Sequence, residues 1–150
     1  MYARILVPID GSPTAECGLG EAIRLAQAMR GRIVALTVSA GFVGAMEMAS
    51  ARDYQESSAR QLKACTDLVD AAASRARDAG VECDKVVADN RGRSVAQTIL
   101  DECATWNCDL VVMGTHGRRG LTRMVLGSDA EAVLRGARTP VMLVRPSEAH

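Results

Sequence analysis

Residues 110–128 read LVVMGTHGRRGLTRMVLGS, and the three parts of this stretch predict a class of fold. The apolar residues Leu110–Met113 form a short run typical of a strand that is buried on both faces. Glycines at positions 114, 117 and 127 follow the run, and Ser128 stands where a helix begins. A buried strand, a glycine-containing loop and a helix form the repeating unit of an α/β fold.

The same alternation extends along the whole chain. Short aliphatic runs alternate with longer segments of helical period, which predicts a parallel sheet covered by helices on both faces. The expected strands are Ile5–Ile9, Arg32–Val38, Val81–Ala88, Leu110–Met113 and Val141–Val144. The chain has 150 residues, 48% of them hydrophobic, so we expect residues 1–150 to form a single domain.

Capping residues and glycines mark the first two expected helices. Ser12 and Pro13 suit the start of the first helix, and Gly31 suits its end. Gly80 ends the second helix. The expected buried face of the second helix consists of Leu62, Cys65, Val69, Ala72 and Ala76.

Two further helices are expected in the second half of the chain. The third runs from about Ser94 to Ala104. The fourth begins at Ser128, whose spacing to Glu131 is that of a capping box, and it ends near Gly136. The segment Ser39–Arg52 has too little pattern to be assigned.

Composition excludes several classes of partner. Eighteen basic residues balance 18 acidic ones, so the chain lacks the charge that nucleic acid or an anionic membrane would attract. With aromatic residues at 3% of the chain, there are too few rings for base stacking. The longest uncharged stretch, Ile33–Met46, is shorter than the roughly 20 residues that span a bilayer, and the start of the chain resembles a strand rather than a signal peptide. We therefore expect a cytoplasmic protein that contacts neither nucleic acid nor a membrane.

Five cysteines are scattered singly along the chain without the spacing of a disulfide framework, and we expect them to be reduced. Cys103 and Cys108 resemble half of a metal site. However, no second cysteine pair accompanies them, and the histidines are His116 and His150. Buried thiol packing is therefore the favoured interpretation, and we expect no metal site.

The loop after Met113 has features that favour an anion. Gly114 and Gly117 allow the backbone to approach a phosphate without a Cβ, and the helix start at Ser128 offers N–H groups and a hydroxyl. The simpler interpretation is that the glycines turn the chain and the serine caps a helix. Considered together, the glycines and the serine at the end of one strand favour phosphate binding.

Other nucleotide-binding motifs are absent from the sequence. There is no Gly-Lys-Ser or Gly-Lys-Thr of a P-loop. Gly18 and Gly20 lack the third glycine of a dinucleotide fingerprint and lie inside the first expected helix. Close helix packing explains these two glycines better.

A glycine pattern in this loop resembles the ATP-binding signature of the universal stress protein family. The pattern is Gly-x-x-Gly followed by nine residues and Gly-Ser, and its residues are Gly114, Gly117, Gly127 and Ser128. The resemblance covers essentially the whole chain through Ile5–Ser12, Gly92–Leu100, Asp109–Gly117 and Thr139–Arg145. It implies a Rossmann-like, adenine nucleotide alpha hydrolase-like fold whose five-stranded parallel sheet has the strand order 3-2-1-4-5. Ligands of such sheets bind where the strand order reverses, here between the first and fourth strands.

The resemblance implies an ATP site at this reversal. Pro8, Asp10 and Val38 would approach adenine and ribose. The residues that would surround the ribose and phosphates are Met113, Gly114, His116, Gly117, Arg118, Gly127 and Ser128, followed by the backbone of Asp129 and Ala130.

Several of these residues have a second interpretation. Asp10 equally suits a turn, and Val38 by itself suits a core position. His116 has no visible partner to orient it, so we assign it a contact and no catalytic role. Loop arginines are commonly solvated, yet their geometry also suits phosphate, which leaves both roles open for Arg118, Arg119 and Arg123.

Asp129 departs from the family pattern, in which a small or apolar residue follows the Gly-Ser pair. Its carboxylate suits the start of a helix but would repel a nearby triphosphate. A side chain that points away leaves binding intact. One that points inward lowers the affinity or requires Mg²⁺ as a bridge.

Three functions remain open from the sequence. The first is an ATP-binding stress-response protein that acts as a nucleotide-dependent binding or signalling module. The second is a slow ATPase or nucleotidyl transferase, although the Ser-Gly-Gly-rich pyrophosphate loop of such enzymes is missing after Asp10. The third is a dimeric scaffold with a vestigial nucleotide site. The resemblance also implies a homodimer through the strand Pro140–Val144, whose open edge invites pairing.

Overall fold

The computed structural model describes residues 1–40, 50–115 and 126–147. Strands and helices alternate along the chain as β1 (Arg4–Pro8), α1 (Pro13–Met29), β2 (Arg32–Ser39), α2 (Ala51–Asp78), β3 (Cys83–Asp89), α3 (Val95–Thr105), β4 (Leu110–Gly114), α4 (Ser128–Gly136) and β5 (Val141–Val144). The strands form one parallel sheet in the order β3-β2-β1-β4-β5. The predicted fold class and strand order are confirmed.

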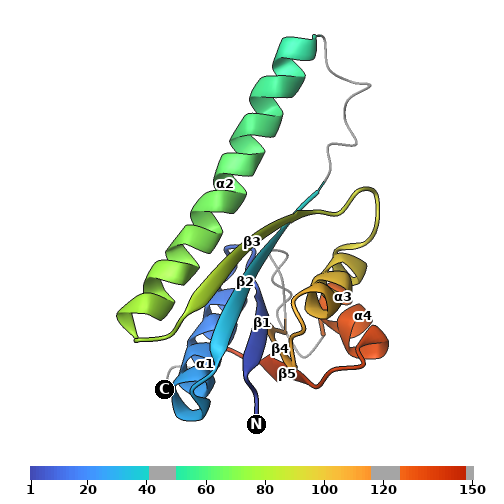
Figure 1. Ribbon diagram of the computed structural model, residues 1–150. Helices are drawn as coiled ribbons and strands as arrows, with labels where there is room; N and C mark the ends of the chain where they lie inside the picture. The colour runs from blue at the N-terminus through green and yellow to red at the C-terminus, as the bar shows by residue number, and fades with distance from the viewer. Residues whose placement is uncertain (41–49, 116–125, 148–150) are drawn as a thin grey trace.

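Helices cover both faces of the sheet (Figure 1). Alternate residues of a strand point to opposite faces, and β1 therefore contributes to two core layers. Ile5 and Val7 pack with α1 and α2, whereas Leu6 packs with α3 and α4. All three side chains are fully buried, as expected for a parallel sheet covered on both sides.

The first helix begins as the sequence predicts but ends differently. The Ser12 hydroxyl accepts a hydrogen bond from the Ala15 N–H at 3.2 Å. At the other end, Arg30 and not Gly31 adopts the left-handed conformation, with φ 54°. Gly31 is required for another reason, because a Cβ there would lie 2.7 Å from the Tyr2 carbonyl oxygen.

The second helix is longer than its apolar pattern indicates. It begins after Ser50, which lies inside the segment left unassigned from the sequence; residues 41–49 lie outside the described part of the chain. The predicted face is buried from Cys65 onward, but Leu62 is 56% exposed, so that part of the prediction is wrong. Figure 1 shows the reason: the first half of α2 extends beyond the ends of the strands, where no sheet lies beneath it.

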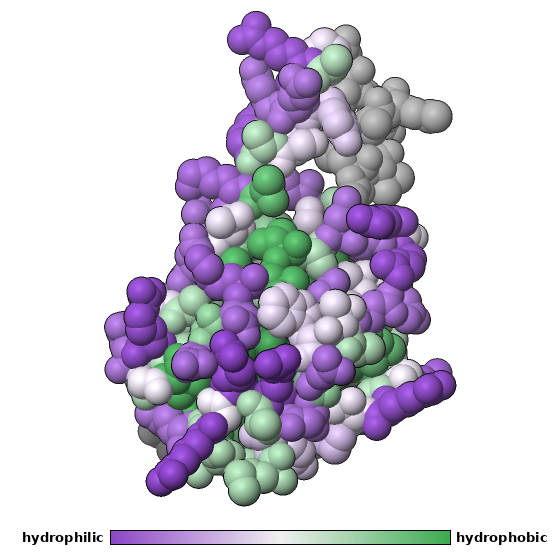
Figure 2. All heavy atoms as spheres, in the orientation of Figure 1, coloured by the Kyte–Doolittle hydropathy of each residue, from purple (hydrophilic) through white to green (hydrophobic). Residues whose placement is uncertain are grey.

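The surface in the view of Figure 2 is largely hydrophilic, with apolar atoms gathered between α2 and the pair α3 and α4. This apolar area lies where Figure 1 shows the edge strand β3 and its neighbour β2. None of the described helices is both long and apolar enough to cross a membrane.

Helix α1 and strand β4 approach each other at their backbones. A Cβ at Gly114 would lie 2.6 Å from the Thr14 carbonyl carbon, and one at Gly18 would lie 3.3 Å from the Gly114 nitrogen. Close packing therefore explains Gly18, as the sequence predicts. It also gives Gly114 a structural role that does not depend on a ligand.

We expect Gly114→Ala to lower the free energy of unfolding by about 1–3 kcal/mol, since the added methyl group meets the Thr14 backbone, which is costly to displace. Gly136→Ala is the matched control. Its Cβ would lie equally close, 2.6 Å, to a methyl group at the flexible end of Leu100, so we expect a loss below about 1 kcal/mol. Urea denaturation measures both variants, and equal losses would contradict the role assigned to the Thr14 backbone.

Candidate functional site

The order of the strands reverses at β1. The chain passes from β1 to β2 on one side, whereas β4 and β5 lie on the other. The ladder between β1 and β2 has five registered pairs and continues to Pro8, but the ladder between β1 and β4 has two and stops at Leu6 and Val111. The carboxyl ends of β1 and β4 are therefore the edge at which sheets of this class bind ligands.

The chain leaves β1 through a tight turn. Pro8 is half-buried at the strand end, and the Asp10 Oδ1 atom accepts a hydrogen bond from the Ser12 N–H at 2.9 Å. The turn is held to β2 because the Thr37 hydroxyl donates to the Ile9 carbonyl at 3.0 Å. Asp10 thus has the turn role that the sequence allows, at the position where the ribose contact is predicted.

The two ends of the loop after β4, Thr115 and Gly127, are hydrogen-bonded to each other. The Gly127 N–H donates to the Thr115 carbonyl at 2.7 Å, and the Thr115 N–H donates to the carbonyl of Val144 in β5 at 3.1 Å. The residue that opens α4 is therefore fixed beside the carboxyl end of β4. Ser128 and Asp129 are exposed in the first turn of α4, whereas Ala130 is buried.

The predicted capping box is wrong. Gly127 is the N-cap of α4, because its carbonyl accepts the hydrogen bond from the Glu131 N–H at 2.9 Å. Ser128 is consequently the first residue inside the helix, where its hydroxyl makes no capping hydrogen bond, and Glu131 pairs with Arg135 instead. Helix α4 differs here from α1, α2 and α3, which are each capped by a serine side chain.

The structure brings most of the predicted residues to this edge, but not all of their side chains are available there. Met113 and Ala130 are buried in the core, so only their backbone atoms could contact a ligand. Val38 is half-buried near the end of β2 and packs against the same core layer. His116, Gly117 and Arg118 lie outside the described residues, as do Arg119 and Arg123.

The first turn of α1 also contributes to this edge, which the sequence pattern did not predict. The first turn of α1 lies against Gly114, and the hydroxyl oxygens of Ser12 and Thr14 are 3.2 Å apart in that turn. The available signal was the pair of hydroxyl residues around Pro13, directly after β1. Ser12 was expected to cap the helix, whereas no role was expected for Thr14.

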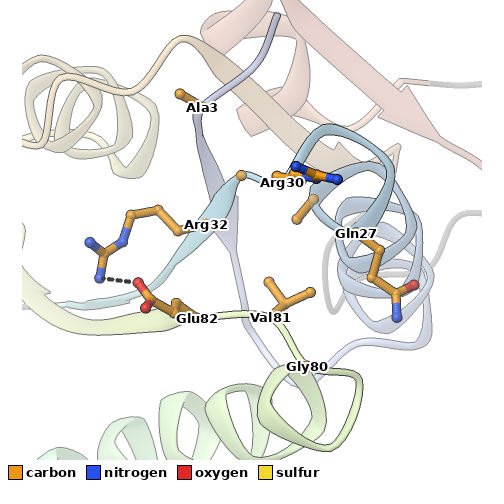
Figure 3. Close-up of a pocket in the computed structure, with 9 residues that line it drawn as sticks. Ala3, Gln27, Arg30, Arg32, Gly80, Val81 and Glu82 are labelled. Atoms are coloured by element: carbon orange, nitrogen blue, oxygen red, sulfur yellow. Dashed lines mark ion pairs between the residues drawn. The ribbon is translucent and has the colours of Figure 1, made fainter.

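A hollow of about 430 Å³ lies at the opposite end of the sheet. Segments that precede β1, β2 and β3 line it, including Ala3, Arg30 and Gly80. Figure 3 shows Arg32 and Glu82 paired across one side of it, at 3.3 Å. The hollow faces the amino ends of the strands, where sheets of this class do not bind their ligands, and it adds nothing to the site at the strand reversal.

Within residues 1–40, 50–115 and 126–147, the structure contains no group of three or more acidic, histidine or cysteine side chains that could hold a metal ion.

Comparison with known proteins gives consistent results. The model of the universal stress protein family matches residues 1–145. The chain is 36% identical over 147 residues to the universal stress protein Rv2005c of Mycobacterium tuberculosis, a match that covers 97% of this chain. It covers 46% of Rv2005c, so the chain spans about half the length of this curated relative.

Solved structures share the fold. A universal stress family protein from Burkholderia pseudomallei superimposes with a TM-score of 0.77 and 28% identity, over 95% of this chain and 96% of that protein. The universal stress protein of Archaeoglobus fulgidus in complex with dAMP superimposes with a TM-score of 0.65 and 22% identity, over 95% of this chain and 97% of that one.

We expect Ser128→Ala to change the free energy of unfolding by less than about 0.5 kcal/mol, because this hydroxyl does not cap its helix. Ser94→Ala is the matched control. The Ser94 hydroxyl accepts from the Gln97 N–H at 3.1 Å, and its removal is expected to cost about 1 kcal/mol. Thermal or urea unfolding compares the two variants, and a larger loss for Ser128→Ala would mean that the hydroxyl has a structural role after all.

Proposed function

The chain belongs to the universal stress protein family, and from that premise we propose that it binds an adenine nucleotide, ATP, at the carboxyl ends of β1 and β4. The observation that carries the proposal is the start of α4. This helix begins at the strand reversal with no side-chain cap on its first N–H groups, and the hydroxyl of Ser128 is exposed beside them. Uncapped N–H groups at the positive end of a helix dipole are suited to a phosphate.

The surrounding residues fit the remainder of the nucleotide. Asp10 follows β1 in a fixed turn, and its carboxylate can accept hydrogen bonds from ribose hydroxyls. Val38 at the end of β2 offers an apolar contact for adenine. Gly114 and Gly127 bring backbone atoms to the edge without a Cβ. The glycines and arginines between residues 116 and 125 complete the phosphate site in this proposal.

Nucleotide binding within the same fold supports the proposal. The Archaeoglobus fulgidus protein has the same architecture and was solved with dAMP. For the present chain we favour ATP, since the spacing Gly114, Gly117, Gly127 and Ser128 resembles the ATP-binding signature of the family. Because no catalytic residue is assigned, we infer that the nucleotide acts as a switch for partner binding in the stress response and is turned over slowly or not at all.

Asp129 is compatible with this site when its carboxylate remains in solvent. Its side chain is exposed in the first turn of α4, where water and salt screen its repulsion of a phosphate. Mg²⁺ that accompanies ATP would reduce the repulsion further, since it prefers carboxylate and phosphate oxygens as ligands. We therefore propose that the bound species is ATP with Mg²⁺, within one domain formed by residues 1–150 of a cytoplasmic protein.

We expect ATP to bind the nucleotide-stripped protein in a calorimetric titration and to bind more tightly with Mg²⁺. Ser128→Ala should lower the affinity about tenfold, because a hydrogen bond to a charged phosphate oxygen is lost. Ser94→Ala, which removes a serine at the start of α3, should leave the affinity unchanged. Gly117→Val, checked for folding by circular dichroism, should abolish binding. Absence of binding to the unmodified protein would contradict the nucleotide proposal and favour a vestigial site.

We also propose that β5 pairs with a second copy of the chain. It is an edge strand bonded only to β4 in the described sheet, and each of its side chains is half-buried. Such an edge offers free backbone groups to another strand. Pairing through Pro140–Val144 would give a symmetric homodimer.

Leu143→Lys should weaken this dimer, since it places a charge within the paired strand. Leu134→Lys, on the exposed surface of α4, is the matched control and should leave the dimer intact. Light scattering at micromolar concentration measures the mass of each variant. A monomer mass for the unmodified protein would refute the dimer without affecting the nucleotide proposal.

A further inference from the structure

The end of α3 brings two cysteines together. The Asn107 N–H donates to the Ala104 carbonyl at 3.1 Å, and the Cys108 N–H donates to the Cys103 carbonyl at 2.9 Å. Asn107 has φ 50°, in the left-handed region. These are the hydrogen bonds of a Schellman motif, in which the side chains at the positions of Cys103 and Cys108 contact each other.

The same motif ends α2 with a different pair of side chains. The Gly80 N–H donates to the Arg77 carbonyl and the Val81 N–H donates to the Ala76 carbonyl, each at 2.9 Å. The side chains brought together there, Ala76 and Val81, are buried and apolar. An apolar pair is therefore sufficient for this helix end, and the two thiols in α3 are not required by the motif itself.

The two thiols differ in their hydrogen bonds and in their acidity. The Cys103 thiol donates to the Cys108 carbonyl oxygen at 3.7 Å and to the Thr139 hydroxyl oxygen at 3.8 Å. The interaction with the Cys108 side chain, together with that with Thr139, outweighs burial and the nearby Asp109 charge and lowers the pKa of Cys103 to about 6. The hydrogen bond to Cys103, together with burial, raises the pKa of Cys108. Cys103 is thus the more acidic thiol of the pair, and its thiolate is the form that reacts.

We propose that Cys103 and Cys108 form a redox-active dithiol that a small hydroperoxide oxidises to a disulfide. The Cys103 sulfur attacks the O–O bond, which breaks as an S–O bond forms, and one alcohol or water molecule leaves. The Cys108 sulfur then attacks Cys103, the S–S bond forms, and a water molecule leaves. Two electrons pass from the sulfurs to the peroxide, and the two thiol protons end on its oxygens.

The arrangement suits a local disulfide. A disulfide requires two Cβ atoms that point toward each other over a short Cα separation, and the backbone hydrogen bond of the motif holds the two residues close. The pair precedes β4, whereas the proposed nucleotide site follows it. The inference therefore does not depend on the proposed function.

Cys65 provides an internal comparison for reactivity. It is 8% exposed, close to the 5% of Cys103 and the 7% of Cys108, so burial alone would make the three thiols equally slow to react. The difference that we expect comes from the neighbouring Cys108 thiol and from the lowered pKa of Cys103. Cleavage with trypsin separates Cys65 from the pair, because residues 94–118 contain Cys103 and Cys108 and no internal lysine or arginine.

The test exposes the reduced, folded full chain to hydrogen peroxide, followed by denaturing alkylation and peptide mass spectrometry. We expect the 94–118 peptide to lose two hydrogen atoms and take up no alkyl group. We expect this to occur at least tenfold faster than oxidation of Cys65, and about tenfold more slowly at pH 5 than at pH 8, as the thiolate of Cys103 is protonated. Equal rates for this peptide and Cys65, or a disulfide that forms only in urea, would overturn the proposal.

Variants identify the role of each thiol. Cys108→Val should leave Cys103 to form a sulfenic or sulfinic acid without an intrapeptide disulfide. Cys103→Ala should remove the fast reaction. The double variant Cys103→Ala with Cys108→Val copies the apolar pair of α2, and its circular dichroism spectrum shows whether the helix end folds without thiols. Fast oxidation of Cys108 in Cys103→Ala would contradict the assignment of Cys103 as the attacking residue.

Discussion

The contact between the backbones of α1 and β4 constrains the arrangement around the strand reversal. Gly18 and Gly114 face each other's segments without side chains, so the helix lies directly on the end of the strand. A side chain at Gly114 would force the first turn of α1 outward from the sheet. The turn after β1 would then lie farther from the end of β4, and the two segments would no longer meet at one edge of the sheet.

Hydrogen bonds between neighbouring strands fix the rest of this edge. Thr37 holds the turn after β1, and Thr115 ties the start of α4 to β4 while its own N–H is bonded to β5. These bonds join β1 to β2 and β4 to β5 at their carboxyl ends. The exposed start of α4 is thereby held beside the carboxyl end of β4, as the proposed phosphate site on backbone N–H groups requires.

The helix ends show how one motif accommodates different chemistry. Helices α2 and α3 both terminate with the hydrogen bonds of a Schellman motif, yet one brings together alanine and valine and the other two thiols. The backbone geometry is satisfied in either case. Side-chain chemistry at such a position is therefore free to serve a purpose other than folding, such as the redox reaction inferred for Cys103 and Cys108.

The sequence by itself determined the strands and most helix boundaries, because burial of β1, β2 and β4 on both faces requires continuous apolar runs and capping requires particular residue types. The resemblance to a family supplied the strand order, which periodicity cannot encode. Only the tertiary structure decided that Leu62 lies beyond the sheet, that Gly31 and Gly114 avoid neighbouring backbone, and that Gly127 caps α4. The first two depend on contacts with segments distant in the sequence, and the third depends on a one-residue shift in the start of a helix. Such contacts and such a shift leave no local pattern in the sequence.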